Sequence, residues 1–163
     1  MAGRAFLRDL RRLHLGEALL LMEAAWILGV VRWGLRRLRW PVLLRLLRAS
    51  AALTRSPRRG RPGADPAAAV LRAIGRAGRR RTQPPSCLEE ALSVQWMLRR
   101  RHVETQIRIG VTKGDTDGLR GHAWAERTGR VLSVDPLSPA RYALLTGPLD
   151  GQLDELHRRH LSL

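Results

Sequence analysis

Three residues of this chain have side chains that could serve as a nucleophile, a base and an orienting acid. Cys87 is the only cysteine in 163 residues, and His122 and Asp135 follow it in that order. A thiolate attacks carbonyl carbon, an imidazole moves the protons, and a carboxylate fixes the imidazole tautomer. These residue types therefore fit covalent catalysis by a hydrolase or an acyltransferase, provided that the fold brings them together.

Cys87 is predicted to open a helix that covers residues 86–101. Ser86 followed by Glu89 is the pattern of a capping box, in which the two side chains satisfy backbone N–H groups at the helix start. The partial positive charge there stabilises a thiolate, and the backbone N–H of Cys87 could bind an oxyanion. Glu89 and Glu90 oppose this effect, so the thiolate also needs a basic partner.

His122 and Asp135 are predicted to lie at the ends of strands that follow this helix. His122 opens a strand over residues 121–127, with Trp124 and Glu126 on the same face. Asp135 closes a strand over residues 130–134, after the turn at Thr128-Gly129. His122 would be the basic partner, and Asp135 would hold its tautomer from the far side. The remaining strand covers residues 104–112, and Gln83 is a candidate second oxyanion donor.

Each of these residues also has an ordinary structural interpretation. A lone cysteine often packs as a small buried hydrophobe, and a histidine in a strand is often structural. It is the joint arrangement of Cys87, His122 and Asp135 that favours catalysis. One cysteine and one nearby histidine do not supply four ligands, so we expect no metal and no cofactor.

The N-terminal half is predicted to be helical over residues 4–14, 15–40 and 42–53, with Pro41 breaking the run. Trp26, Trp33 and Trp40 recur every seven residues and would share one helix face. That face either packs on the rest of the protein or binds a partner, which could be a protein or a membrane surface.

Residues 54–66 are rich in proline, glycine and arginine and are predicted to be a linker. The chain then divides into a Leu/Arg-rich helical region, residues 1–53, and a catalytic domain, residues 67–163. Within that domain we expect further helices over residues 67–81, 139–146 and 149–160.

The net charge of +16 belongs to the N-terminal half. Residues 1–60 carry 13 arginines against three acidic residues, whereas residues 82–163 are nearly neutral. The preference for arginine over lysine fits either a phosphate-binding protein or a GC-rich genome. The run Arg79-Arg80-Arg81 has no interleaved aromatic residues, which argues against nucleic acid as a partner.

The sequence shows no convincing secretory signal or membrane span. The apolar run Leu15–Val31 is interrupted by Glu17 and Glu23, and no small-residue cleavage site follows it. A single cysteine excludes an intramolecular disulfide and is compatible with a reducing compartment. We therefore expect a cytoplasmic protein and leave peripheral contact with a membrane open.

The residues around the three candidates resemble a known family. Residues 86–101, 108–111, 122–126 and 129–132 resemble the transglutaminase-like cysteine proteases of lasso-peptide biosynthesis, and the likeness is specific over about residues 86–142. The chain looks like the stand-alone, C-terminal peptidase half of a split B protein. This resemblance implies an α+β, transglutaminase-like or papain-like core, in which a cysteine-bearing helix packs on a small antiparallel sheet after a basic helical region.

The resemblance also implies a function. Such a protein removes the leader from a ribosomally made lasso-peptide precursor, with Cys87 as nucleophile, His122 as base and Asp135 as third member. A separate leader-binding recognition-element protein, the other half of the split B protein, delivers the precursor. An ATP-dependent lasso cyclase then joins the released amine to an acidic side chain.

Two other functions stay open. The same triad would serve a transglutaminase-like acyltransferase, because water or an amine can resolve the acyl-enzyme. Alternatively, the chain is a binding module without chemistry, whose basic N-terminal half docks on nucleic acid or an anionic membrane.

Overall fold

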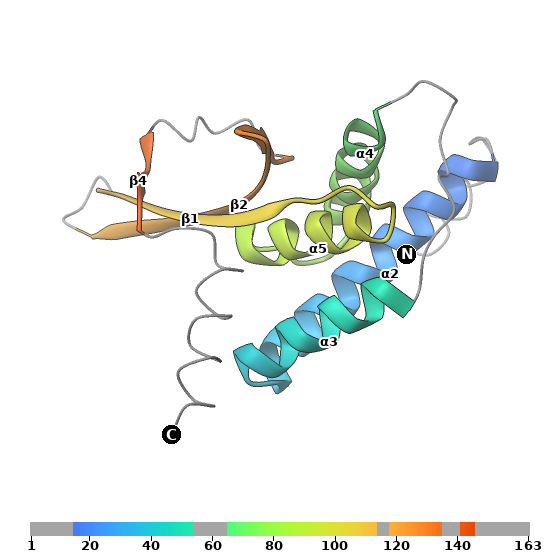
Figure 1. Cartoon of the computed structure of the whole chain (residues 1–163), viewed down its shortest axis with the longest axis horizontal. Coiled ribbons are helices and arrows are strands. Elements are labelled where there is room, and N and C mark those ends of the chain that lie inside the picture. The colour runs from blue at the N-terminus through green and yellow to red at the C-terminus, as the bar shows by residue number, and fades with distance from the viewer. Residues whose placement is uncertain (1–14, 54–64, 114–117, 135–140, 146–163) are drawn as a thin grey trace.

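The protein is described here by a computed structural model that covers residues 15–53, 65–113, 118–134 and 141–145. The helices come first in the chain, and the strands follow (Figure 1). The helices are α2 (Leu15–Arg37), α3 (Trp40–Leu53), α4 (Pro66–Arg79) and α5 (Cys87–Arg99). The strands are β1 (Gln106–Lys113), β2 (Leu119–Arg127), β3 (Arg130–Leu132) and β4 (Ala143–Leu144). The expected α+β class is therefore confirmed.

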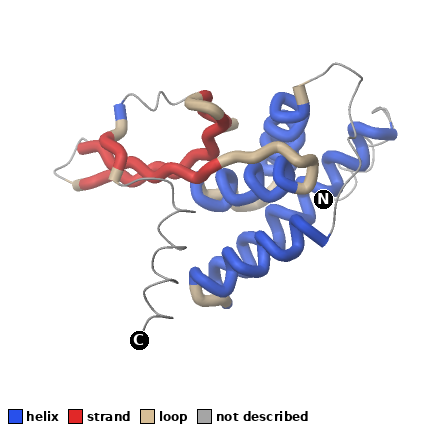
Figure 2. The backbone as a smooth tube through the Cα atoms, viewed as in Figure 1, coloured by secondary structure: helices blue, strands red, loops and turns tan. Residues whose placement is uncertain are grey.

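The strands form one antiparallel sheet in the order β3-β2-β1-β4. The long strands β1 and β2 pair from Gln106 opposite Glu126 to Lys113 opposite Leu119. Helix α5 packs against both of them, and α2, α3 and α4 pack in turn on α5 (Figure 2). Consequently α5 is the element that joins the helical part of the molecule to the sheet.

Local sequence explains where α4 and α5 begin. Asp65 caps α4 by accepting a hydrogen bond from the N–H of Ala67, and Pro66 occupies a first-turn position that needs no N–H. At α5 the capping box is complete. The N–H of Glu89 donates to Ser86 Oγ at 3.2 Å, and the N–H of Ser86 donates to Glu89 Oε2 at 3.0 Å. The predicted cap is thus confirmed.

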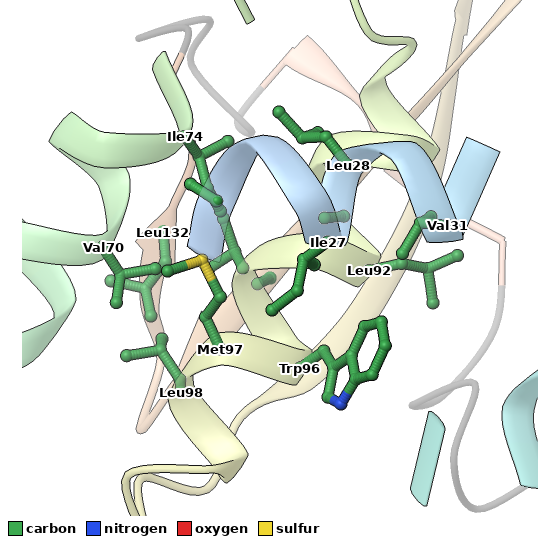
Figure 3. Close-up of a cluster of buried hydrophobic side chains, with 14 of the residues drawn as sticks. Ile27, Leu28, Val31, Val70, Ile74, Leu92, Trp96, Met97, Leu98 and Leu132 are labelled. Carbon is green, nitrogen blue, oxygen red and sulfur yellow. The ribbon is translucent and has the colours of Figure 1, made fainter. Parts of the chain in front are cut away.

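Helix α2 contributes side chains to the same hydrophobic core as α4, α5 and the sheet. Figure 3 shows Ile27, Leu28 and Val31 of α2 among side chains from α4, α5 and β3. Burying a large aliphatic side chain stabilises the fold by about 1.5–3 kcal/mol. Labelled partners in the figure are Val70, Ile74, Leu92, Trp96, Met97, Leu98 and Leu132. The domain boundaries at residues 53 and 67 stay a prediction.

Ion pairs connect α2 to the end of α5. Arg101 is 3% exposed, and its guanidinium contacts both carboxylate oxygens of Glu23 while also donating to the carbonyl of Met97. Arg100 also pairs with Glu23, at 2.8 Å. These residues lie far apart in the sequence, so the pairs hold α2 against the end of α5.

Two expectations about local structure are wrong. A helix is expected over residues 139–146, but the described part of that range, residues 141–145, contains β4, because Ala143 and Leu144 pair with Val111 and Gly110 at the edge of β1. Tertiary pairing overrides a weak local preference there. The helix expected over residues 15–40 ends at Arg37, and a new helix begins at Trp40.

This break changes the interpretation of the tryptophans. Trp40 belongs to α3, whereas Trp26 and Trp33 remain on α2 and are 59% and 58% exposed. Trp26 still packs on the core through its contact with Trp96, whose ring centroid lies 5.8 Å away, and more than half of both side chains on α2 faces outward. Helix α2 is long and apolar enough to cross a membrane by length and composition, and core helices pass the same test. The segments 4–14 and 149–160 lie outside the described residues.

Candidate functional site

Cys87 is the first residue of α5, directly after the Ser86 cap. Its thiol is free and partly buried, and it packs against the edge of the hydrophobic core. The residue therefore has the position that the sequence predicted: a cysteine at the positive end of a capped helix.

A clamp from α2 holds the segment that precedes Cys87. Arg32 Nε donates to Glu89 Oε1 at 2.9 Å, and Arg32 Nη2 donates to Glu89 Oε2 at 3.1 Å. The same guanidinium donates to the backbone carbonyls of Pro84, at 2.9 Å, and Gln83, at 3.4 Å. One side chain thus ties the approach to Cys87 and the first turn of α5 to α2.

The clamp also changes the electrostatics of the helix start. Burial by itself would raise the pKa of Glu89, but hydrogen bonds from Arg32 and from the N–H of Ser86 outweigh it, aided by the charges of Arg32 and Arg81. The net result is a pKa below the usual glutamate value, while the pKa of Arg32 is raised by the same hydrogen bond. Glu89 is therefore an ionised but paired carboxylate, and its charge opposes a thiolate at Cys87 less than an unpaired one would.

Two further contacts fix the surroundings of the helix start. Glu90 Oε1 accepts from the N–H of Val134 at 2.7 Å, which ties the segment after β3 to the first turn of α5. On the other side, Gly78 of α4 lies so close to Pro85 that a Cβ at residue 78 would come within 3.1 Å of the proline ring. Cys87 is thereby held between α2, α4 and the end of β3.

His122 lies in β2 opposite Gly110 of β1. Its ring stacks on Tyr142, with centroids 5.1 Å apart, and on Trp124, with centroids 5.9 Å apart. Its Nε2 is buried and makes no hydrogen bond. The imidazole is therefore oriented by aromatic rings and keeps one nitrogen available.

Gly110 makes this aromatic arrangement possible. A Cβ at that residue would meet the side chain of Tyr142 at 2.7 Å, the Trp124 ring at 3.1 Å and the carbonyl oxygen of Ala143 at 3.2 Å. The absence of a side chain at residue 110 lets both rings approach His122 across the sheet.

The structure places Cys87 and His122 on elements that pack together, but no hydrogen bond joins the thiol to the imidazole among the described residues. Ala123 and Ala125 of β2 belong to the core that α5 shares. Because side chains alternate along a strand, His122 lies on the other face of the sheet, beside Tyr142 and away from α5. Asp135 lies outside the described residues.

Arg32 and Tyr142 were not identified from the sequence. Arg32 is one of thirteen arginines in the first 60 residues, and nothing in its spacing distinguishes it. Tyr142 is the only tyrosine of the chain, and that rarity was the one available signal. Gln83, the candidate second oxyanion donor, contributes its backbone carbonyl to the Arg32 clamp.

A cavity of about 740 Å³ lies at the opposite end of α5 from Cys87. It contains neither Cys87 nor His122, so we do not assign it to this chemistry. Its lining includes Arg99, His102, Arg108, Glu126 and Arg127. Among the described residues, no cluster of three or more His, Cys, Asp or Glu side chains is placed to hold a metal ion.

Comparison with known families identifies a superfamily. A model described as the transglutaminase-like superfamily matches residues 25–146, which is more than half of the chain and includes the C-terminal part of α2, the helices α3, α4 and α5, and the sheet. Neither the curated proteins nor the solved structures contain a significant match.

Proposed function

Because the chain belongs to the transglutaminase-like superfamily, we propose that it is a cysteine peptidase that removes the leader from a lasso-peptide precursor. The family supports cysteine-dependent peptidase or acyltransferase chemistry. The likeness of residues 86–101 and 122–126 to lasso-peptide leader peptidases carries the finer part of the proposal.

One structural observation supports the chemistry most strongly. Cys87 begins a helix whose cap is complete, and the acidic residue of that cap is paired with Arg32. The positive helix end and its free N–H groups can then act on the sulfur and on a nearby oxyanion. From the sequence alone, the negative charge of Glu89 would oppose a thiolate at Cys87. Its pairing with Arg32 reduces that effect and leaves Glu89 as part of the helix cap.

In the proposed reaction Cys87 Sγ attacks the carbonyl carbon of the scissile amide and forms a tetrahedral oxyanion near the N–H groups of the helix start. The C–N bond then breaks, and His122, protonated by the thiol, gives its proton to the leaving amine of the core peptide. Water attacks the thioester, His122 takes the water proton and returns it to the sulfur, and the leader leaves as a carboxylic acid. Asp135 would orient the imidazole.

His122 must reach Cys87 for these steps, and its buried Nε2 has no hydrogen-bond partner. His122 lies on the face of the sheet opposite to the one that packs on α5, so the pair requires a rearrangement of β2 that brings the imidazole to the sulfur. We propose that this rearrangement occurs when the precursor binds, delivered by a separate leader-binding recognition-element protein. A lasso cyclase would then use the amine that cleavage releases. The compartment that fits these partners is the cytoplasm.

The test is to incubate precursor, leader-binding protein and this protein, and to identify the products by mass spectrometry. We expect leader and core fragments whose masses add to precursor plus one water. Cys87→Ala and His122→Ala should abolish cleavage, and Asp135→Asn should reduce it. His102→Asn is a matched control, because His102 is exposed and has φ of 58°, which asparagine tolerates.

Other results would assign a different function. A product that gains the mass of an amine, with no added water, would identify an acyltransferase. Cleavage by Cys87→Ala equal to that of the unmodified chain would refute the assignment of the nucleophile. If Cys87 takes part in no reaction and the protein binds nucleic acid in a salt-sensitive way, the chain would be a non-catalytic binding module.

A further inference from the structure

Helix α2 carries an exposed apolar stripe on the side away from the core. The stripe is formed by Leu15, Met22, Trp26 and Trp33, which are 79%, 50%, 59% and 58% exposed. Their spacings of seven, four and seven residues place them within a sector of about 40° on the helix surface. Water-soluble proteins rarely expose an apolar surface of this kind unless it binds something.

Trp26, in the middle of the stripe, is held by a contact with the core. The ring of Trp26 lies 5.8 Å from the ring of Trp96, which is only 5% exposed in the core. Trp26 is therefore anchored on its inner side while more than half of it faces outward. An ordered aromatic ring loses less conformational entropy on binding than a mobile side chain does.

Basic residues follow the stripe directly. Arg36 and Arg37 lie in the last turn of α2, Arg39 comes two residues later, and all three are exposed. The acidic residue in the middle of the helix, Glu23, is engaged by Arg100 and Arg101. The outer side of α2 is therefore apolar along its length and cationic at its C-terminal end.

This distribution fits the surface of a bilayer that contains anionic lipids. Tryptophan prefers the boundary between headgroups and acyl chains, and arginine binds phosphate groups. A helix of this kind lies in the plane of the interface, and nearby basic residues strengthen its binding to acidic lipids. The first 60 residues, with 13 arginines against three acidic residues, add a long-range attraction of the same sign.

The structure also determines how α2 can meet the membrane. Its inner side is in the core, with Leu21, Ile27 and Val31 at most 1% exposed, and Arg32 holds Glu89. A membrane-spanning α2 would have to abandon these contacts. We propose that α2 lies on an anionic bilayer surface through the Leu15–Trp33 stripe and Arg36, Arg37 and Arg39, and that it remains part of the folded domain. This inference does not depend on the peptidase activity.

Sedimentation of the full-length protein with vesicles tests the proposal. We expect binding to vesicles of phosphatidylcholine with about one third phosphatidylglycerol, and at least about tenfold weaker binding to phosphatidylcholine alone. Trp33→Ser should weaken the binding to anionic vesicles by about tenfold. Leu145→Ser, which removes a residue 54% exposed beyond β4, should not.

Two double charge-reversal variants distinguish binding through the end of α2 from a general attraction between the positively charged protein and the anionic vesicles. Arg36→Glu/Arg37→Glu should reduce vesicle binding at least about tenfold. Arg72→Glu/Arg76→Glu alters two exposed arginines of α4 by the same total charge and should have a clearly smaller effect. Circular dichroism checks that each variant is folded.

Three results would overturn the proposal. The first is no sedimentation of the unmodified protein with anionic vesicles. The second is an equal loss in the two charge-reversal variants, which would indicate nonspecific attraction. The third is unchanged vesicle binding by a folded Trp33→Ser variant that no longer binds the leader-binding protein, which would assign the stripe to a protein partner.

Discussion

The guanidinium of Arg32 in α2 binds both carboxylate oxygens of Glu89, the residue that completes the cap of the Cys87 helix. The two residues are separated by 57 positions in the sequence. The same guanidinium reaches the carbonyls of Gln83 and Pro84. The position of the candidate nucleophile thus depends on a residue of the N-terminal helical region.

Arg32→Ala is expected to lower the rate of leader cleavage by about a hundredfold, because the segment before Cys87 loses its anchor and small displacements of a reacting group are costly. Arg32→Lys should retain part of the activity, since lysine keeps the charge but not the two-pronged geometry. Arg36→Ala, which removes an exposed arginine one turn away, is the control and should cleave normally. Full activity in a folded Arg32→Ala protein would show that the clamp has no part in catalysis.

The Glu89 carboxylate should make stability depend on pH. Its pKa is lowered in the folded protein, so its contribution to the free energy of unfolding is complete above about pH 4.5 and is lost as the pH falls through the lowered value. Urea unfolding followed between about pH 6 and pH 3 should show this loss, and Glu89→Gln should make the curve flatter. Glu104→Gln, at an exposed position, should leave the curve unchanged.

Gly110→Ala should disturb the environment of His122. The added methyl group would lie 2.7 Å from the Tyr142 side chain and 3.1 Å from the Trp124 ring. Overpacking of this kind costs about 1–3 kcal/mol. We expect reduced thermal stability and at least a tenfold slower cleavage rate, since the imidazole shifts. Gly121→Ala, where a Cβ would meet nothing within 4 Å, is the matched control; similar losses in both variants would contradict this explanation.

Glu23→Ala should destabilise the fold strongly. It leaves the guanidinium of Arg101, which is 3% exposed, without its carboxylate partner. Removing one member of a buried ion pair costs about 3–5 kcal/mol. Chemical denaturation measures this directly. Glu17→Ala, which alters an exposed acidic residue of the same helix, should change the free energy of unfolding by less than about 0.5 kcal/mol.

Alkylation can report whether the thiol and the imidazole are already paired in the free protein. Cys87 is the only cysteine, so intact-mass measurement follows its labelling by iodoacetamide without ambiguity. The structure has no hydrogen bond between Cys87 and His122, so His122→Ala should change the labelling rate by less than about twofold while abolishing cleavage. A tenfold slower labelling in His122→Ala would show instead that the pair exists before substrate binds.

Local patterns predicted the elements of the site well. The capping box at Ser86 and Glu89 depends on four consecutive residues, and it forms as expected. The alternation in β1 and β2 likewise determined which residues share a face, and His122 and Trp124 do stack. A cap and the alternation of a strand each depend on interactions between residues close together in the sequence, so the sequence alone predicts them.

Long-range contacts could not be predicted in this way. The partners of Glu23 and Glu89 lie 78 and 57 residues away, and each is one of many arginines with similar neighbours. The strand at Ala143 and Leu144 arises because the edge of β1 supplies hydrogen-bond partners, which the local sequence does not reveal. Whether Asp135 completes the triad stays a prediction.

The shared core of α2, α4 and α5 has a practical consequence for protein engineering. A shortened chain beginning at Thr82 would retain Cys87, His122 and Asp135, but it would expose the side of α5 that now contacts Ile27 and Ile74. Such a fragment should be insoluble. Chimeras that test the proposed activity with a leader-binding module should therefore be joined ahead of α2, so that the three helices are kept as one unit.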